Sequence, residues 1–391
     1  MNIFELLNDR YFLSDKPKLF EAFSGIGCQL MAFKRLGIEV ESVGFSEIDK
    51  YAIQSYNAIH CDTKNFGSIC DIKGTDLPQI DVFTWSFPCT DLSKAGKQKG
   101  LTNTRSGLVY EVLRIMQECK VNGNLPKVLI MENVVDLVQV KFIREFQEIQ
   151  LELEELGYSN YTQTLNAKDY GVAQNRDRVF MVSILGDYYY EFPKPIKLEK
   201  RLKDYLDDEV DEKYYLSDKL LNFFEENSVR NEMNGNGFRF KPKDKEAIAN
   251  AVTTLAGNRM DDNFIKIPED TMQSGNREPK VSIMGNVNPS GIGVVEHSGL
   301  YLHDSEAFHK DDLPGMSRCL KANKHDAGVN DGLRIRKLTP LECWRLMGID
   351  DDNFHKAKAS GVSNSQLYKQ AGNGIVVDVF ASILSTMKGN V

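Results

Sequence analysis

Five short, almost continuously apolar runs alternate with helical patterns in the first 190 residues, and this alternation restricts the possible folds more than any other feature. Helices that cover both faces of a parallel sheet leave its strands apolar throughout, which is the pattern seen here. The sequence therefore predicts an α/β fold with a doubly wound, mostly parallel sheet. The predicted strands are residues 18–23, 41–47, 81–87, 128–134 and 178–185.

Segments of helical periodicity separate these runs. Residues 28–37 end at Gly37, which suits a helix C-cap, and residues 49–60 begin with Asp49, a favoured N-cap residue. In residues 106–119 the apolar side chains recur at helical spacing, which predicts a helix with one buried face.

The composition changes after Tyr190. From Pro193 to about Asp331 the chain is rich in Asn, Gly and Asp, with few periodic runs, which indicates an irregular, loop-rich module. The last segment returns to apolar helical patterns, so we expect it to rejoin the first domain. We therefore predict a discontinuous domain of residues 1–190 plus 335–391 and a second, smaller domain of residues 191–334.

Composition excludes several classes of protein. The chain is 41% hydrophobic and 27% charged, which is typical of a globular protein and not of a disordered or collagen-like one. No apolar stretch approaches the roughly 20 residues of a membrane helix, and the first residues lack the layout of a secretion signal, so we expect a cytoplasmic protein. The seven cysteines are scattered without a C-x-x-C pair, which predicts neither a zinc site nor disulfides. Most of them should be reduced core residues.

Charge is unevenly distributed along a chain whose formal net charge is −8. Residues 318–337 hold six basic side chains and two acids, whereas residues 204–212 hold six acids and no base. On charge alone we interpret both segments as solvated surface. Whether they have a further role depends on where they lie relative to the catalytic residues.

A glycine-bearing turn, FSGIG at residues 23–27, follows the first apolar run and leads into a helix. Such a turn lets the backbone approach a bound ligand closely, although tight packing produces it too. Glu47 closes the second run, where a carboxylate can accept both hydroxyls of a ribose, and Asp71 follows a third candidate strand end, from which it could bind an adenine amine. Leu30 stands where a dinucleotide-binding motif has its third glycine. The pattern therefore favours a nucleoside without phosphates, such as S-adenosylmethionine, over NAD.

Polar groups also occupy the ends of the later predicted strands. Cys89 directly follows residues 81–87, Glu132 lies near the end of residues 128–134, and Arg176 and Arg178 stand at the start of the last run. Doubly wound folds bind ligands at strand ends, where a thiol can act as a nucleophile and a buried carboxyl can hydrogen-bond or protonate a substrate nitrogen. Each group alone suits a salt bridge or a cap, but their combination predicts a catalytic site.

At this point the chain resembles the DNA (cytosine-5) methyltransferases of bacteria and phages over nearly its whole length. FSGIG is similar to their first motif, PCTDLS (88–93) to their nucleophile motif, ENV (132–134) to that of the catalytic glutamate, and QNRDR (174–178) to that of the substrate-positioning arginines. The stretches at 336–348 and 370–379 are similar to the last two motifs. Cys28 departs from the glycine of many members, and Thr90 from the glutamine that often follows the nucleophile.

The resemblance implies an enzyme that transfers a methyl group from S-adenosylmethionine to carbon 5 of cytosine in a specific duplex DNA sequence, with S-adenosylhomocysteine as product and no metal. It implies that Cys89 is the nucleophile, that Glu132 contacts the ring nitrogen, and that Arg178 with Arg176 clamps the base. Residues 1–190 plus 335–391 would then be the catalytic domain and residues 191–334 the target-recognition domain. The residues implied to line the cofactor site are Phe23, Gly25, Gly27, Glu47, Ile48, Asp71, Ile72, Pro88, Leu108 and Asn373.

The substrate base must leave the duplex before a thiol can reach it, and phosphate and base contacts must offset the cost of this flipping. Residues 96–105 form a glycine-bracketed, lysine-bearing loop with the composition of a lid that faces a polyanion, and we expect the basic run at 318–337 to face DNA as well. The candidate DNA contacts are Ser93, Lys94, Lys97, Gln98, Lys99, Arg105, Lys321 and Lys324. We expect a monomer that associates with the nucleoid when bound to DNA, and the resemblance allows a separately acting restriction endonuclease as partner.

Three alternatives remain open from the sequence. A tRNA cytosine-5 methyltransferase of the same family would keep the chemistry, but such members have a shorter recognition region and a different residue pattern after the nucleophile. A dinucleotide-dependent oxidoreductase would bind NADH and would not need Cys89. A DNA-binding protein without catalytic activity would not need Cys89, Glu132 and Arg178 together.

Overall fold

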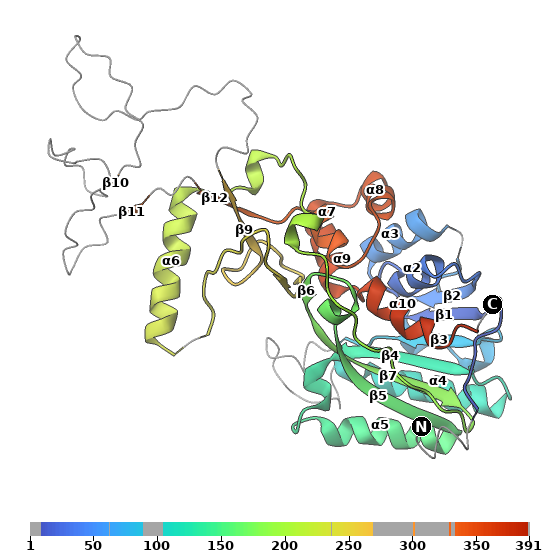
Figure 1. Cartoon of the computed structure of the whole chain (residues 1–391). Helices are drawn as coiled ribbons and strands as arrows, with labels where there is room; N and C mark the ends of the chain where they lie inside the picture. Colours follow the sequence, from blue (N-terminus) through green and yellow to red (C-terminus); the bar gives the residue numbers. More distant parts are fainter. Residues whose placement is uncertain are drawn as a thin grey trace, which may run out of the picture.

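The computed structural model describes residues 9–61, 63–88, 105–235, 237–268, 300–301, 328–329 and 333–389. Its centre is a six-stranded sheet in the order β2-β1-β3-β4-β7-β5 (Figure 1). The sheet confirms the predicted α/β fold and all five predicted strands. The strands are β1 (Lys18–Ala22), β2 (Glu41–Ser46), β3 (Val82–Trp85), β4 (Val128–Val134), β5 (Tyr158–Asn166) and β7 (Asp177–Leu185).

Strand direction differs at one side of the sheet. The pairs β2–β1, β1–β3 and β3–β4 are parallel, whereas β7 runs antiparallel to both β4 and β5. The start of β7 therefore lies at the same sheet edge as the carboxyl ends of β1 to β4. The sequence prediction did not include β5, which lies at the outer edge of the sheet and whose middle residues are polar and partly exposed.

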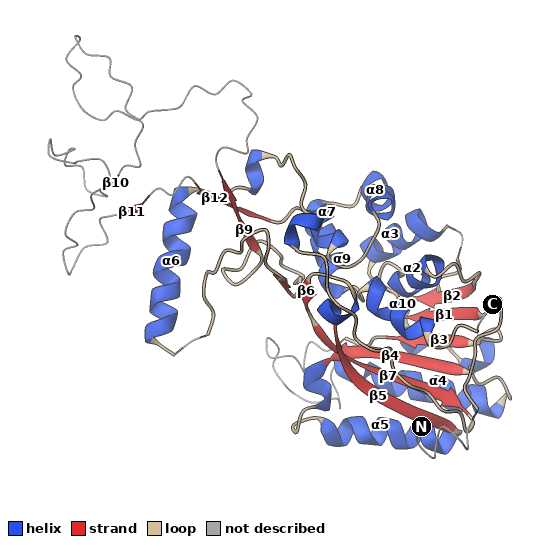
Figure 2. Cartoon of the chain, in the orientation of Figure 1, coloured by secondary structure: helices blue, strands red, loops and turns tan. Residues whose placement is uncertain are grey.

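Helices cover both faces of the sheet (Figure 2). On one face, α4 (Val109–Val121) and α5 (Ile143–Leu156) pack with Phe20, Phe83 and Leu129. On the other face, α2 (Cys28–Arg35) and α10 (Val377–Ser385) pack with Leu19 and Val82. Successive strand residues thus enter opposite clusters, which is why the strands read as continuous apolar runs.

Helix ends follow the predicted capping. The Asp49 side chain accepts hydrogen bonds from the backbone N–H groups of Tyr51 and Ala52 at the start of α3 (Lys50–His60), and Gly37 takes a φ of 64° just beyond α2. Near the C-terminus, α7 (Pro340–Arg345), α8 (Asp351–Ala359) and α9 (Asn364–Asn373) precede α10, and buried residues of all four helices share one apolar cluster with α2.

The region after residue 190 holds fewer regular elements. It contains α6 (Asp218–Met233), an antiparallel pair of β9 (Phe264–Pro268) with β12 (Leu333–Lys337), and the two-residue strands β8 (Ala249–Asn250), β10 (Leu300–Tyr301) and β11 (Gly328–Val329). The two-residue strand β6 (Gln174–Asn175) precedes this region and pairs in parallel with β8. In Figure 1, α6, β9 and β12 lie to one side of the six-stranded sheet. Leu202, Tyr205 and Val252 nevertheless belong to the same apolar cluster as α2 and α10. The division at residues 190 and 335 stays a prediction.

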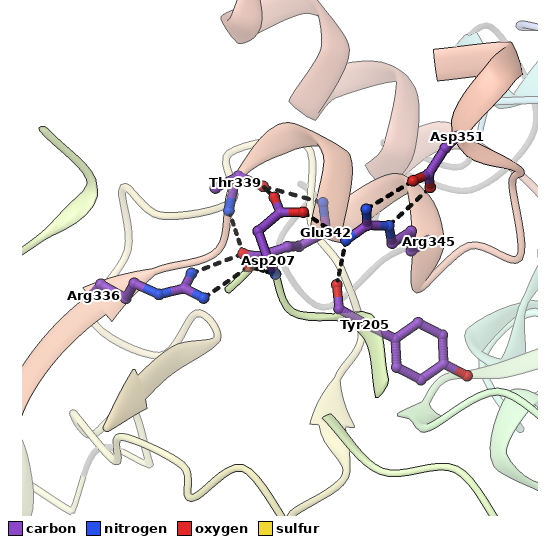
Figure 3. A network of polar contacts seen from close by, with 7 residues as sticks. All are labelled: Tyr205, Asp207, Arg336, Thr339, Glu342, Arg345 and Asp351. Atoms are coloured by element: carbon purple, nitrogen blue, oxygen red, sulfur yellow. Dashed lines mark hydrogen bonds and ion pairs between the residues drawn. The ribbon is translucent and has the colours of Figure 1, made fainter. Parts of the chain in front are cut away.

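A buried polar network joins the segment before α6 to the junction of β12 and α7 (Figure 3). Arg336, only 1% exposed, donates through both terminal nitrogens to the Glu342 carboxylate, at 2.8 and 2.7 Å. The same carboxylate accepts the backbone N–H groups of Thr339 at 2.7 Å and Asp207 at 2.8 Å. The Asp207 carboxylate in turn pairs with Arg345 at 2.8 Å. The network therefore fixes three chain segments to one another.

These contacts correct the prediction that the whole basic run at 318–337 faces DNA. Arg336 is buried and paired, so it does not contribute to a DNA-facing surface. Arg334 pairs with Glu212, from the acidic segment, and its guanidinium lies 4.0 Å over the Tyr215 ring. Arg334 and Arg336 therefore serve internal contacts, with Glu212 and Glu342 as their acidic partners.

Cysteine placement agrees in part with the expectation of buried thiols. Cys28, Cys119 and Cys343 are buried, whereas Cys61 and Cys70 are exposed. Burial raises the pKa of Cys28 to about 12 and that of Cys119 to about 11, so both thiols stay protonated at neutral pH. In the part of the chain that the structure describes, no helix is long and apolar enough to cross a membrane.

Candidate active site

One edge of the sheet gathers most of the predicted functional groups that the structure describes. Parallel strands end at the same edge, so the loops after β1, β2 and β3 and the end of β4 meet there. Because β7 is antiparallel, its first residues lie at this edge as well. The opposite direction of β7 therefore explains how arginines that precede a strand can reach a glutamate near the end of another.

Glu132 lies at the centre of this edge. It is 6% exposed, its Oε1 lies 3.0 Å from Nε of Arg178, and its Oε2 accepts a 2.7 Å hydrogen bond from Oγ of Ser86. In the β4–β7 register Arg178 is opposite Val134, two residues beyond Glu132, so the two charged side chains are diagonal neighbours on one sheet face. The structure thus brings into direct contact two residues that the sequence gives as separate site candidates, and their roles toward a base stay predictions.

The segment after β3 is tied to the end of β4. Beside the Ser86–Glu132 bond, Nδ2 of Asn133 donates to the backbone carbonyl of Phe87 at 3.3 Å. Pro88 follows, and Cys89 lies outside the described residues. Sequence reasoning missed Ser86, although its position directly after an apolar strand was a usable signal. The nucleophilic role of Cys89 stays a prediction.

Arg176 lies in a different environment from Arg178. It is 4% exposed, and its terminal nitrogens donate to the backbone carbonyls of Val252 (3.0 Å), Gly372 (3.0 Å) and Gly374 (3.1 Å). These bonds hold the turn that carries Asn373 against the region after residue 190. They support a role for Arg176 in joining chain segments, and they leave Arg178 as the candidate clamp on a base.

The FSGIG turn has an unusual backbone. Phe23, Gly25 and Gly27 take φ values of 54°, 56° and 77°, and a positive φ is rare for a bulky residue such as phenylalanine. The turn is held by hydrogen bonds from Ser24 N to the Ser46 carbonyl (3.1 Å) and from Gly27 N to the Ser24 carbonyl (2.9 Å). This strained geometry ends β1 at Ala22, one residue before the predicted strand end, and the turn itself is buried or partly buried at the sheet edge.

Glu47 is bound to this turn. Its Oε2 accepts the Gly25 N–H at 2.9 Å, and its Oε1 accepts the N–H groups of Ile48 and Asp49, each at 2.8 Å. Asn65 supports the same residue, because its Nδ2 donates to the Glu47 carbonyl at 3.0 Å. The structure therefore brings the glycine turn and Glu47, both predicted to bind a cofactor, into direct contact.

The surroundings of Glu47 fit the ribose of a nucleoside cofactor. A Cβ at Gly25 would meet no atom within 4 Å, so there is free space in front of the turn. Glu47 is partly exposed, and its Oε2, which accepts only the Gly25 N–H among the described residues, has a further lone pair for a hydroxyl. Next to it, the Ile48 side chain is 74% exposed, which leaves an apolar surface that a ring could cover.

The other predicted cofactor residues are distributed around this turn. Asp71 is exposed and ends a 3-10 turn, η1 (Ile69–Asp71), so the prediction that it follows a strand was wrong. The Ile72 side chain is buried in the α4–α5 cluster, and Leu108 is partly buried against the same cluster. Asn373 is exposed at the end of α9, and the next residue, Gly374, would place a Cβ 3.3 Å from the Cys28 sulfur at the start of α2.

Two buried titratable groups lie beneath the turn, and sequence reasoning missed both. His60 Nε2 lies 3.0 Å from the Ile26 carbonyl, and a Cβ at Gly27 would overlap the His60 ring. Burial, with a smaller contribution from Lys34, lowers the pKa of His60 to about 3, so the ring is neutral and donates to Ile26. Burial raises the pKa of Glu21 to about 7, although the hydrogen bond from Tyr56 opposes this shift.

The predicted DNA contacts fall largely outside the described residues. These are Ser93, Lys94, Lys97, Gln98, Lys99, Lys321 and Lys324, and of Arg105 only the backbone is described. Among the described residues, no cluster of His, Cys, Asp or Glu could hold a metal ion.

The described groups suit chemistry on a nitrogen heterocycle. A carboxylate held by a guanidinium and a hydroxyl keeps lone pairs free to accept a hydrogen bond from a ring nitrogen or amine. The FSGIG turn and Glu47 lie at the ends of β1 and β2, whereas Glu132 lies near the end of β4. A nucleoside site at the turn is therefore separated from the Glu132 carboxylate by the intervening strand β3.

Comparisons with known proteins point to the same kind of enzyme as the sequence motifs. The model of the C-5 cytosine-specific DNA methylase family matches residues 18–389. The chain is 31% identical to the type II methyltransferase M2.ScrFI of Lactococcus lactis subsp. cremoris, over 95% of this chain and 98% of that protein. It is 30% identical to the orphan methyltransferase M.SPRI of Bacillus phage SPR, over 95% and 97%. The solved structure of the Entamoeba histolytica methyltransferase EhMeth matches with a TM-score of 0.67 at 17% identity, over 96% of this chain and 98% of that one, which shows a shared fold.

Proposed function

Because this chain belongs to the C-5 cytosine-specific DNA methylase family, we infer that it methylates carbon 5 of a cytosine within a specific sequence of duplex DNA. Methyl transfer from S-adenosylmethionine to cytosine is the reaction of the family. The duplex substrate, the flipped base and the covalent intermediate are the specific parts of our proposal.

The cluster of Glu132, Arg178 and Ser86 carries this proposal. A carboxylate whose two oxygens are held by Arg178 and Ser86 lies where a cytosine could present its ring nitrogen and exocyclic amine. The amine donates and the ring nitrogen accepts, so a carboxyl group that carries a proton matches both. Arg178, which is partly exposed, would contact a carbonyl oxygen of the same ring.

The proposed mechanism begins with Cys89. Carbon 5 of cytosine is a poor nucleophile, but addition of the Cys89 thiolate to carbon 6 shifts electron density to carbon 5 and to the ring nitrogen. Glu132, when it carries a proton, would donate it to this nitrogen and so offset the negative charge that develops there. S-adenosylmethionine, when bound, supplies the electrophilic methyl group and leaves as S-adenosylhomocysteine. Loss of the carbon-5 proton and release of Cys89 then restore the aromatic ring.

The cofactor would lie along the FSGIG turn. Glu47 would accept the ribose hydroxyls, Ile48 would cover one face of the adenine, and the exposed Asp71 is the candidate for its amine. The Cβ-free Gly25 and Gly27 let the cofactor approach the backbone. Phe23, Ile72, Pro88, Leu108 and Asn373 complete the proposed lining.

DNA binding would involve the parts of the chain that flank this edge. We assign residues 1–190 plus 335–391 to catalysis and residues 191–334 to target recognition. The lysines of residues 94–99, together with Lys321 and Lys324, would neutralise phosphates and offset the cost of moving the base out of the duplex. We expect the enzyme to act as a monomer, and any cognate restriction endonuclease to act separately.

The direct test offers the purified enzyme tritium-labelled S-adenosylmethionine with duplex DNA and with tRNA, side by side. The proposal predicts label in DNA, and bisulfite sequencing of a plasmid co-expressed with the enzyme should then reveal one recurrent sequence of protected cytosines. Label in tRNA alone would replace the DNA proposal by the RNA alternative, and label in neither would refute the proposed activity.

A further inference from the structure

We propose that Ser86 is a positioning residue for Glu132, whose hydroxyl sets the carboxylate in the orientation that receives the base. The proposal rests on the role of Glu132 in the proposed function and adds a residue that none of the family motifs quoted above includes. Its first support is the 2.7 Å bond from Ser86 Oγ to Oε2 of Glu132.

The two oxygens of Glu132 have different partners. Arg178 Nε contacts Oε1 at 3.0 Å, while Ser86 contacts Oε2. One partner alone would let the carboxylate rotate about its last bond, whereas two partners on different oxygens fix its plane. Each oxygen keeps a lone pair for the substrate, so the plane that Ser86 helps to set is the plane in which a cytosine ring must lie.

The Ser86 hydroxyl is itself held in place by its neighbours. Trp85, the last residue of β3, pairs with Met131 in the sheet, and the Trp85 and Phe87 rings stack with centroids 5.8 Å apart. Phe87 is buried, and its carbonyl accepts the Asn133 amide at 3.3 Å. Ser86 therefore lies between two anchored residues, which hold its backbone beside Glu132.

A hydroxyl suits this position in both protonation states of the carboxyl. It donates to Oε2 when Glu132 is ionised, and it can rotate and accept when Glu132 carries a proton. If Glu132 passes a proton to the ring nitrogen during addition of Cys89 and regains it when the ring is restored, Ser86 can follow both changes without a new partner.

The chain offers a matched control two residues earlier. Thr84 is buried in β3, and within the described residues its Oγ1 has no hydrogen-bond partner. Thr84→Val removes a hydroxyl of the same strand without removing a contact to Glu132. Ser86→Ala removes the contact, and Ser86→Thr keeps the hydroxyl.

The test measures single-turnover methyl transfer to duplex DNA, together with equilibrium binding of DNA and of S-adenosylmethionine. Loss of one hydrogen bond to a charged group predicts that Ser86→Ala lowers the transfer rate about 10- to 100-fold, with both dissociation constants within about twofold of wild type. Ser86→Thr should restore most of the rate, and Thr84→Val should match wild type.

A double-mutant cycle separates this proposal from the proposed function. In a Glu132→Ala background, Ser86→Ala should cause no further loss of rate, and the same cycle measured by urea unfolding, which needs no turnover, should show coupling between the two residues. The role of Ser86 would be overturned if Ser86→Ala kept the wild-type transfer rate, or if it lowered the rate equally in the wild-type and Glu132→Ala backgrounds. It would also be overturned if Thr84→Val lowered the rate as much as Ser86→Ala does. A wild-type rate for Glu132→Ala would instead refute the proposed role of Glu132.

Discussion

Replacing Arg336 by methionine should destabilise the protein far more than the loss of a charged side chain at the surface would. Arg336 is 1% exposed and holds both oxygens of Glu342, which is itself fully buried. Removing one partner of a buried ion pair leaves an uncompensated charge and costs about 3–5 kcal/mol. The network of Figure 3 adds to this cost, because the same carboxylate also holds the backbone N–H groups of Thr339 and Asp207.

Arg334 provides the control on the same strand. Its partner Glu212 is half exposed, and its guanidinium lies over the Tyr215 ring. An exposed ion pair and a cation–π contact of this kind contribute about 1 kcal/mol each at most. Arg334→Met should therefore lower the free energy of unfolding by about 1–2 kcal/mol, against about 3–5 kcal/mol for Arg336→Met.

Urea unfolding followed by circular dichroism measures both changes. Binding of duplex DNA at several salt concentrations measures whether either arginine contacts phosphate. Arg336→Met should lower stability and leave the salt dependence unchanged. The reasoning would be refuted if both variants lost the same stability. It would also be refuted if Arg336→Met kept its stability and showed a flatter salt dependence of DNA binding.

Three further predictions test the site and its surroundings. Glu132→Gln should raise the barrier for methyl transfer by about 2–4 kcal/mol in single-turnover assays, with DNA and cofactor binding retained, and a wild-type rate would exclude its role. The pKa of Glu21, raised to about 7 in the folded protein against 4.5 when unfolded, means that the native state binds the extra proton. The free energy of unfolding should therefore fall by about 3 kcal/mol as the pH rises from 4.5 through 7. Glu21→Gln should reduce this dependence on pH, measured by urea unfolding at several pH values, and an unchanged dependence would contradict the assignment. Replacing Lys321 and Lys324 together by alanine should flatten the salt dependence of DNA affinity, and an unchanged slope would mean that neither lysine contacts phosphate.

The sheet was predictable where its strands are buried on both faces. β1, β3 and β4 contribute residues to the clusters on both sides, so each strand reads as a continuous apolar run. β5 escaped prediction because it is an edge strand with a polar, partly exposed centre. The direction of β7 could not be predicted either, because a buried strand has the same apolar pattern in both directions.

The site was predictable where a motif coincides with a strand end. Glu132, Arg178 and the turn that binds Glu47 were found in this way, and their contacts are present. Arg176 and Arg336 show the limit of such reasoning, because burial against partners in the folded chain decides their roles, and the sequence does not show this burial. For example, Arg176 donates to Gly372, a contact between residues 196 positions apart.

Small polar residues were the hardest to interpret. Ser86 makes one hydrogen bond with Glu132 and Asn65 makes two with the Glu47 backbone, and neither residue type signals such a role by itself. His60 reads as an ordinary helix residue in the sequence, and only its position against Gly27 shows that it supports the turn.

The most direct measurement concerns the sulfur of Cys89. A duplex oligonucleotide with 5-fluorocytosine at the methylated position cannot lose the carbon-5 substituent as a proton, so the enzyme should remain covalently attached to it in the presence of S-adenosylmethionine. We predict a complex that survives denaturing electrophoresis with the wild-type enzyme and is absent with Cys89→Ser. A wild-type enzyme that methylates the normal duplex but never forms this complex, or a Cys89→Ser variant that still forms it, would contradict the mechanism.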